Sequence, residues 1–313
     1  MKQPRYVMGR LEWIMLLSLS LLWGFSFINI KISLNEIPPI SLVFLRLCIA
    51  FAALFIWCLL RRKNLLLSGK NHLILMLGGF LSCAVPFSLF SWGQQHVPTS
   101  IGAIFNGCVP FFTAFLAHFW IGGSERMSNR KTIGLSAGLL GILVIIGIDN
   151  LTRLEPTNLG QLAMILACFF YAFSSIYFQK FIPRTLDKTV VTTFTLFWGG
   201  IAIAFLSIPM DGLPSLDYSP KVWFSLSILS LFSTALAYVI LFRLLRRAGP
   251  SNTSLNTFII PIVGILVGIL FLDERLVLED IVGVILIFIG VAIIQNASKL
   301  LKNIVNYKTK KSH

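Results

Sequence analysis

Apolar residues run in long blocks along this chain, separated by charges, prolines and turn residues. Ten blocks result, and each is long enough to cross about 30 Å of hydrocarbon at 1.5 Å per residue. Helices satisfy every backbone amide internally, whereas a β-barrel would show alternating segments of about ten residues, which are not seen. The pattern predicts an all-α polytopic membrane protein. The expected transmembrane helices are 11–31, 39–60, 71–95, 98–122, 131–149, 158–180, 189–210, 221–245, 251–272 and 278–297.

Composition excludes a soluble globular domain. Of the 313 residues, 56% are hydrophobic and only 12% are charged, and the mean hydropathy is +0.84. Soluble domains carry about 25% charged residues, so this chain cannot cover a surface facing water. All five cysteines lie in apolar blocks and none forms a C-x-x-C pair, so neither a metal site nor a redox cofactor is expected.

The positive charge is concentrated on one set of alternating loops. With the N-terminus inside, 21 of the 26 Lys and Arg residues fall on inner loops, four fall on outer loops, and only Arg46 lies within a span. This asymmetry predicts that both termini are cytoplasmic. The net charge of +14 is then explained by topology and attraction to anionic lipid, so a nucleic-acid partner is not expected.

Two distant stretches share an unusual mixture of apolar residues, prolines and amides. They are "VPTSIGAIFNGCVPF" (Val97–Phe111) and "AGPSNTSLNTFIIPI" (Ala248–Ile262), which align with Pro110 on Pro261. Further pairs match at offsets of 148 to 151: Leu22–Ser26 with Phe170–Ser174, Asn106 with Thr257, Glu125 with Glu274, Thr113 and Ala117 with Gly264 and Gly268, and Gly134 and Gly141 with Gly283 and Gly290. So constant an offset indicates an internal duplication.

The duplication predicts two inverted five-helix repeats. The first covers residues 1–150 and the second residues 151–298, followed by a basic cytoplasmic tail at 299–313. Because each repeat has an odd number of spans, the second enters the membrane in the opposite sense. Inverted repeats are typical of transporters that hold their substrate between the halves, near the midplane.

The paired prolines and small residues have expected structural roles. Pro110 and Pro261 are expected to kink the fourth and ninth helices and to free carbonyls there. The small residues should let helix backbones approach closely in lipid. These packing positions are Thr113, Ala117, Gly134, Gly141, Gly264, Gly268, Gly283 and Gly290.

Arg46 is the sharpest candidate for chemistry. A central arginine costs about 2.5–3.5 kcal/mol on insertion scales, and no Asp or Glu lies mid-span to pair with it. It is either a cavity-facing guanidinium that binds carboxylate or phosphate, or a structural residue that snorkels or caps carbonyls of a kinked helix. Glu12, at the inner end of the first span, is expected to be a solvated helix end, with proton coupling as the alternative.

Amides and amphipathic aromatic residues complete a candidate substrate site. Amides facing lipid are costly, so they should point into the bundle, where they either line a cavity or only bond helices together. Aromatics with a few amides suit amphipathic organic solutes. The candidate substrate-binding residues are Trp23, Asn29, Arg46, Gln94, Asn106, Tyr171, Tyr238 and Asn256.

In combination, several stretches resemble the EamA-like branch of the drug/metabolite transporter superfamily. They are "LLWGFSFINIKISL" (Leu21–Leu34), "FLRLCIA" (Phe44–Ala50), "PTSIGAIFNGCVPFFTAFLA" (Pro98–Ala117), "SERMSNRKTIGLSAGLLGILVIIG" (Ser124–Gly147) and "FIIPIVGILVGILFLDERLVLEDIVGVILIFIGV" (Phe258–Val291). The resemblance implies ten helices in inverted repeats and secondary transport of small solutes, very often export. It does not imply one substrate, since the branch handles amino acids, other metabolites and drugs.

We therefore predict a secondary transporter of small organic solutes in the bacterial inner membrane, working by alternating access, with export as the expected direction. The alternative is a non-transporting receptor subunit or a lipid-modifying enzyme, with a deep cleft of converging acid and base residues. No P-loop or hydrolase motif is present, so no enzymatic activity is expected. The expected partners are the solute and the lipid bilayer. The sequence leaves open the coupling ion and the oligomeric state, a homodimer included.

Overall fold

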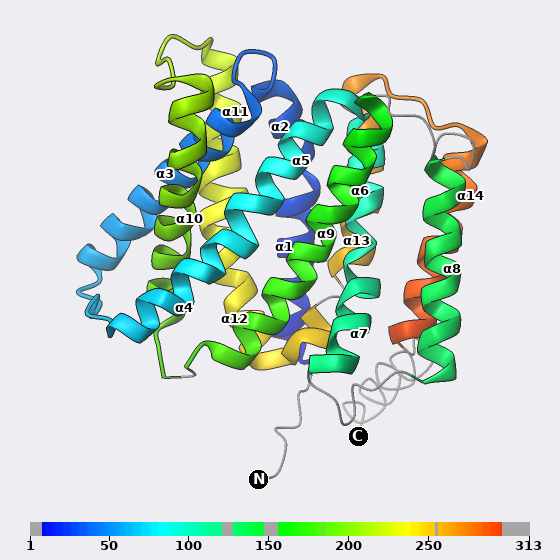
Figure 1. The fold of residues 1–313 in the computed structure, drawn as a ribbon, viewed down its shortest axis with the longest axis horizontal. Helices are drawn as coiled ribbons and strands as arrows, with labels where there is room; N and C mark the ends of the chain where they lie inside the picture. Colours follow the sequence, from blue (N-terminus) through cyan, green and yellow to red (C-terminus); the bar gives the residue numbers. More distant parts are fainter. Residues whose placement is uncertain (1–7, 121–127, 147–155, 184, 254–255, 296–313) are drawn as a thin grey trace.

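The computed structural model describes residues 8–120, 128–146, 156–183, 185–253 and 256–295. Within these ranges the regular structure is entirely helical (Figure 1). Seven helical segments are long and apolar enough to cross a membrane, and two further apolar helices are shorter. Each of the ten predicted spans overlaps one of the helical segments.

Several spans consist of more than one element. Before residue 150 the elements are α1 (Arg10–Gly24), α2 (Ser26–Ser33), α3 (Pro39–Leu60), α4 (Gly69–Gly79), η1 (Phe80–Ala84), α5 (Val85–His96), α6 (Thr99–Asn106), α7 (Val109–Trp120) and α8 (Asn129–Ile146). After it they are α9 (Pro156–Phe181), α10 (Lys188–Asp211), α11 (Pro220–Ser230), η4 (Leu231–Leu236), α12 (Ala237–Thr253), α13 (Asn256–Leu272) and α14 (Leu278–Gln295).

Two helical spans contain a π-helical segment at matching positions. The segment η1 lies between α4 and α5, and η4 lies between α11 and α12. Phe80 and Leu231, the first residues of the two segments, are separated by the same offset of 151 that aligns Pro110 with Pro261. A π-turn widens the helix and leaves carbonyls for other partners, and such turns are frequent at functional sites. Neither segment was predicted from the sequence.

Two spans are interrupted near their middle. Phe25 separates α1 from α2, and Gly107–Cys108 separates α6 from α7. Pro110 follows the second interruption as the second residue of α7, whereas Pro261 lies inside α13. Proline has no N–H, so Pro110 and Pro261 donate no helical hydrogen bond to the carbonyls four residues earlier.

Glycines form a close contact between α8 and α14, which lie side by side at one edge of the bundle (Figure 1). A Cβ added at Gly290 would meet the Gly134 carbonyl oxygen, and one at Gly141 would lie 2.6 Å from the Gly283 carbonyl oxygen. The two helices are therefore antiparallel, with backbones in contact. This is the role that the sequence predicts for these four glycines.

The other predicted packing residues fall into two groups. A Cβ at Gly264 would meet Ala103. One at Gly268 would meet the Glu274 carboxylate and lie 3.3 Å from Ser100, so α13 packs closely against α6.

Thr113, another predicted packing residue, instead lines a central cavity, and its hydroxyl donates to the Val109 carbonyl. The side chain of Ala117 lies outside the described residues.

The outside of the bundle is strongly apolar. Large exposed hydrophobic side chains include Leu60, Phe119, Phe205, Phe224 and Phe271. Buried apolar clusters fill the interior between the helices. A surface of this kind is stable in lipid and not in water, so the chain is an integral multi-pass membrane protein.

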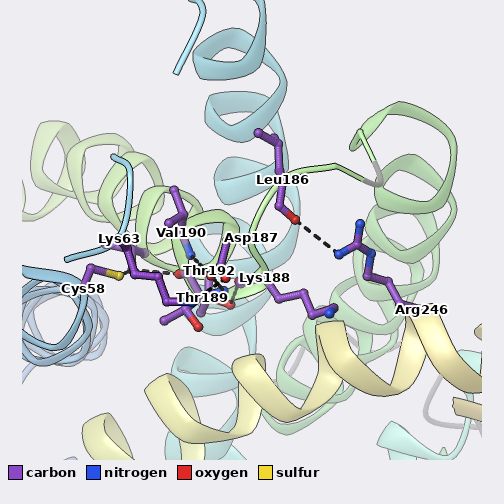
Figure 2. Close-up of polar contacts among 10 residues, drawn as sticks. Cys58, Lys63, Leu186, Asp187, Lys188, Thr189, Val190, Thr192 and Arg246 are labelled. Carbon is purple, nitrogen blue, oxygen red and sulfur yellow. Dashed lines mark hydrogen bonds and ion pairs between the residues drawn. The ribbon is translucent and has the colours of Figure 1, made fainter. Parts of the chain in front are cut away.

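An ion pair at the start of α10 joins this helix to the loop after α3. Lys63 Nζ lies 2.6 Å from Asp187 Oδ2, and Asp187 Oδ1 accepts the N–H of Thr189 at 2.9 Å and that of Val190 at 3.3 Å (Figure 2). Partial burial raises the pKa of Asp187, but the hydrogen bonds from Lys63 and the two amides outweigh it, so the pKa of the carboxyl lies below its ordinary value.

Replacing Asp187 by alanine should destabilise the protein by about 1–2 kcal/mol at neutral pH, because the N-cap and a half-exposed ion pair are both lost. The ionised carboxylate stabilises the fold fully above the unfolded pKa of about 3.9 and loses this effect as pH falls through the lower folded pKa. Thermal unfolding of wild type and Asp187→Asn should therefore differ at pH 7, and the difference should shrink as pH falls through the folded pKa of Asp187. A difference that stays constant with pH would contradict this.

Candidate functional site

A central cavity of about 120 Å³ lies where the interrupted and π-helical segments meet. This is room for on the order of ten water molecules. Its lining comes from α1, α2, α3, η1, α5, α6 and α7 before residue 120, and from α9, α12 and α13 after residue 156. Trp23 and Tyr171 both pack against the two largest buried clusters, so they lie between the main cores of the bundle.

Arg46 is the only charged residue among the described residues that line the cavity. Its side chain is 4% exposed, its Nε donates to Thr234 Oγ1 at 2.6 Å, and its Cζ lies 3.8 Å from the centre of the Phe87 ring. Within the described ranges no carboxylate forms an ion pair with it. The hydrogen bond and the cation–π contact hold the guanidinium in one orientation.

Aromatic rings form much of the wall. Trp23 Nε1 donates to the Ser233 carbonyl at 3.2 Å, and the Tyr238 hydroxyl donates to the Ser82 carbonyl at 2.7 Å. Both acceptors belong to π-helical segments, which explains how their carbonyls are available to side chains. The ring of Tyr238 packs edge-on against Trp23, with centroids 6.3 Å apart. The π-turns therefore fix the aromatic side chains that shape the cavity.

Two serines at matching positions of the duplication line the cavity. Ser26 Oγ donates to the Trp23 carbonyl at 2.6 Å, and Ser174 Oγ donates to the Tyr171 carbonyl at 2.9 Å. They are the last residues of the matched stretches "LWGFS" and "FYAFS". Neither serine was among the predicted site residues, although the repeat aligns the two stretches and was a signal that could have found them.

The structure brings six of the eight predicted site residues to the cavity and leaves two away from it. The lining residues are Trp23, Arg46, Asn106, Tyr171, Tyr238 and Asn256. Asn29 Nδ2 donates to the Phe25 carbonyl at 2.9 Å, and Gln94 Nε2 donates to the Phe27 carbonyl at 3.1 Å. Gln94 thus joins two helices, which is the alternative role considered for the amides, whereas Asn29 bonds within its own span and has neither predicted role.

Pro110 and Pro261 act next to the cavity. The carbonyls that receive no helical hydrogen bond from them belong to Asn106 and Thr257, which both line it. Two residues that the duplication aligns therefore line the same cavity.

Glu12 differs from its expected environment. It is 6% exposed, and its carboxylate lies 2.5 Å from Arg247 Nε and 3.0 Å from the Gly9 amide nitrogen. The expectation of a solvated helix end is wrong, because Arg247 of α12 folds back over α1 and covers the carboxylate. Since Arg247 is distant in sequence, no local pattern revealed this pair.

Glu274 forms the corresponding polar contact at the opposite end of the bundle. Its carboxylate accepts the backbone N–H groups of Thr99 at 2.5 Å and Ser100 at 2.8 Å. These are the first two residues of α6, whose amides have no partner within the helix. The loop after α13 is thereby attached to the start of α6.

The fold and the cavity define a polytopic helical membrane protein with a cavity at its centre. The family model for the EamA-like transporter family matches the chain twice, over residues 11–147 and 158–295. The chain belongs to this family, which confirms the resemblance seen in the sequence, and the family is one of transporters.

Individual relatives carry transporter names, and one solved structure shares the fold of this chain. The chain is 25% identical to an uncharacterized transporter, YoaV, of Bacillus subtilis (strain 168), over 88% of this chain and 94% of that protein. It is 28% identical to a probable amino-acid metabolite efflux pump of Escherichia coli (strain K12), over 91% and 95%. One crystal structure superposes with a TM-score of 0.67 at 16% identity, covering 94% of this chain and 99% of the other, which shows a shared fold.

Proposed function

We propose that this protein is a secondary transporter that moves a small organic solute across the bacterial inner membrane by alternating access. The observation that carries the proposal is the central cavity, to which both family-matched segments contribute lining residues. A site shared between two related halves can face either side of the membrane when the halves rock against each other.

The contacts between the halves support a two-fold relation of inverted five-helix repeats, residues 1–150 and 151–298. Gly134 matches Gly283 in the duplication and Gly141 matches Gly290, yet Gly134 touches Gly290 and Gly141 lies against Gly283. A two-fold axis requires this crossed pairing, because each residue then meets the partner of its equivalent. The matched π-segments support the same relation.

Export is the proposed direction, and the substrate is an amino acid, another metabolite or a drug. The name of the Escherichia coli relative, a probable amino-acid metabolite efflux pump, supports this assignment. The excess of Lys and Arg on alternate loops supports cytoplasmic termini and the basic cytoplasmic tail at 299–313. In this orientation, Glu274 holds the outer end of the bundle and the Glu12–Arg247 pair lies at the inner end.

The alternative of a lipid-modifying enzyme gains no support from the cavity. Converging acid and base groups are needed for such catalysis, and no Asp, Glu or His is among the described residues that line it. The receptor alternative has no specific observation in its favour.

The proposal is tested by solute flux in proteoliposomes, with a block placed in the cavity. Ser175 of α9 lines the cavity, so Ser175→Trp should lower flux at least tenfold by filling the space that the solute needs. Leu166→Trp on the same helix is the control, because Leu166 is 47% exposed on the outside of the bundle and should keep near-wild-type flux. If no amino acid, metabolite or drug is transported by the wild type, or if both variants behave alike, the proposal fails.

A further inference from the structure

The guanidinium of Arg46 retains unused hydrogen-bonding capacity inside the cavity. Its Nε is bonded to Thr234 Oγ1, whose own hydroxyl donates to the Leu229 carbonyl at 2.8 Å. Neither Nη atom has a hydrogen-bond acceptor among the described residues, and neither is a fully enclosed atom. The Nη1–Nη2 edge is therefore free to bond a molecule in the cavity.

A structural role does not account for this arrangement. An arginine that caps carbonyls of a broken helix would donate to them, but Arg46 donates to a hydroxyl. Nor does the duplication require a cation here, since α10, the repeat counterpart of α3, has no Lys or Arg between its first and last residues. Keeping a charge 4% exposed without a counterion costs several kcal/mol, part of which the Phe87 ring offsets.

From this geometry we infer that the transported solute is a monoanionic organic carboxylate with a planar apolar body, its carboxylate held end-on by Nη1 and Nη2 of Arg46. The inference rests on the proposed function and names its substrate class. Two parallel N–H···O bonds match the planar fork of arginine to a carboxylate. Aromatic rings of Phe90 and Tyr171, stacked with centroids 5.8 Å apart, and of Trp23 offer apolar faces to the rest of the solute.

The charge balance of the cavity selects one negative charge. A phosphate dianion would leave one charge without a partner, because no second cation is found among the lining residues that the structure describes. A zwitterion such as an amino acid would bring an ammonium group, and no carboxylate side chain from those residues is present to receive it, so the inference narrows the solutes proposed above to those without an ammonium group. The Tyr171 hydroxyl, which has no hydrogen-bond partner among described residues, is a neutral donor for the carboxylate.

Binding to the purified full-length protein tests the substrate class without requiring transport. The probes are 3-phenylpropionate, indole-3-acetate, methyl 3-phenylpropionate and phenyl phosphate at pH 8, followed by calorimetry and by thermal unfolding. At least one of the two carboxylates should bind, with the ester and the dianion at least tenfold weaker. Equal or tighter binding of the ester or of phenyl phosphate would overturn the inference, as would failure of both carboxylates to bind.

Two substitutions separate a binding role of Arg46 from a structural one. Arg46→Met should weaken carboxylate binding roughly 10- to 100-fold, because charge-assisted bonds are lost. It should not lower the unfolding temperature of the ligand-free protein, since it removes a buried charge without a counterion. Should Arg46→Met not fold, Arg46→Lys keeps the charge but lacks the fork and should bind with intermediate affinity. Unchanged carboxylate affinity in the folded variants would overturn the inference.

Flux measurements keep the two proposals distinguishable. Carboxylate binding that depends on Arg46, without flux in proteoliposomes, would contradict transport and leave the ligand class standing. Flux of a neutral or cationic solute that Arg46→Met leaves unchanged would overturn the carboxylate inference and leave transport standing.

Discussion

Replacing Gly79 by alanine should destabilise the protein by about 1–3 kcal/mol or prevent its folding, because the added methyl group has no space. Its Cβ would meet the Thr195 carbonyl oxygen and lie 2.7 Å from the Gly199 amide nitrogen. Both are backbone atoms of α10, so no side chain can rotate away. The helices would have to separate where α4 and α10 are closest, next to η1.

The matched control is Gly69→Ala at the first residue of the same helix. An added Cβ there has no neighbouring atom within 4 Å, and alanine favours helix, so this variant should be as stable as the wild type or more so. The comparison is made by thermal unfolding of both purified variants in the same detergent. Equal unfolding temperatures would show that the contact between α4 and α10 is not as tight as described.

Replacing Glu274 by alanine should release the start of α6 and speed hydrogen exchange there by roughly 100-fold or more. Hydrogen bonds to a charged acceptor contribute about 1.5–3 kcal/mol each, and Glu274 accepts two, from Thr99 and Ser100. Because this contact closes one end of the bundle, its loss also favours conformations in which that end is open. Exchange followed by mass spectrometry on peptides covering residues 97–106 measures the effect.

Glu279→Ala provides the control for this experiment. Glu279 is exposed in the first turn of α14, and its replacement by alanine removes the same charge a few residues away from Glu274. It should leave exchange in residues 97–106 unchanged. If Glu279→Ala and Glu274→Ala accelerate exchange equally, the effect comes from net charge and not from the contact with α6.

Much of the fold could be predicted from the sequence, because a membrane restricts which backbone structures and which side chains are stable within it. Ten apolar blocks predicted where helical segments lie, since each block must hide its backbone amides in lipid. The repeated offset predicted that α8 and α14 carry matching glycines, and these now form a close helix contact. The burial cost of a lone arginine singled out Arg46 before any contact was known.

The sequence could not tell which polar residues reach the cavity. Asn29 and Asn106 occur in similarly apolar surroundings, yet only Asn106 lines the cavity, while Asn29 bonds to its own helix. Helices that are apolar on every side carry little periodic signal, so the rotation of each helix about its axis stays undetermined. The π-turns were invisible for a related reason, since a single inserted residue in a uniformly apolar run changes no pattern.

The chain by itself determined its placement in a membrane, its duplication and the presence of a buried cation, because these follow from composition, spacing and the cost of charge in lipid. Only the tertiary structure decided the partners of those groups. The pairing of Glu12 with Arg247, of Glu274 with α6 and of Arg46 with Thr234 joins residues more than 170 positions apart. Such contacts depend on how whole helices pack against one another, so the local sequence around each residue does not predict them.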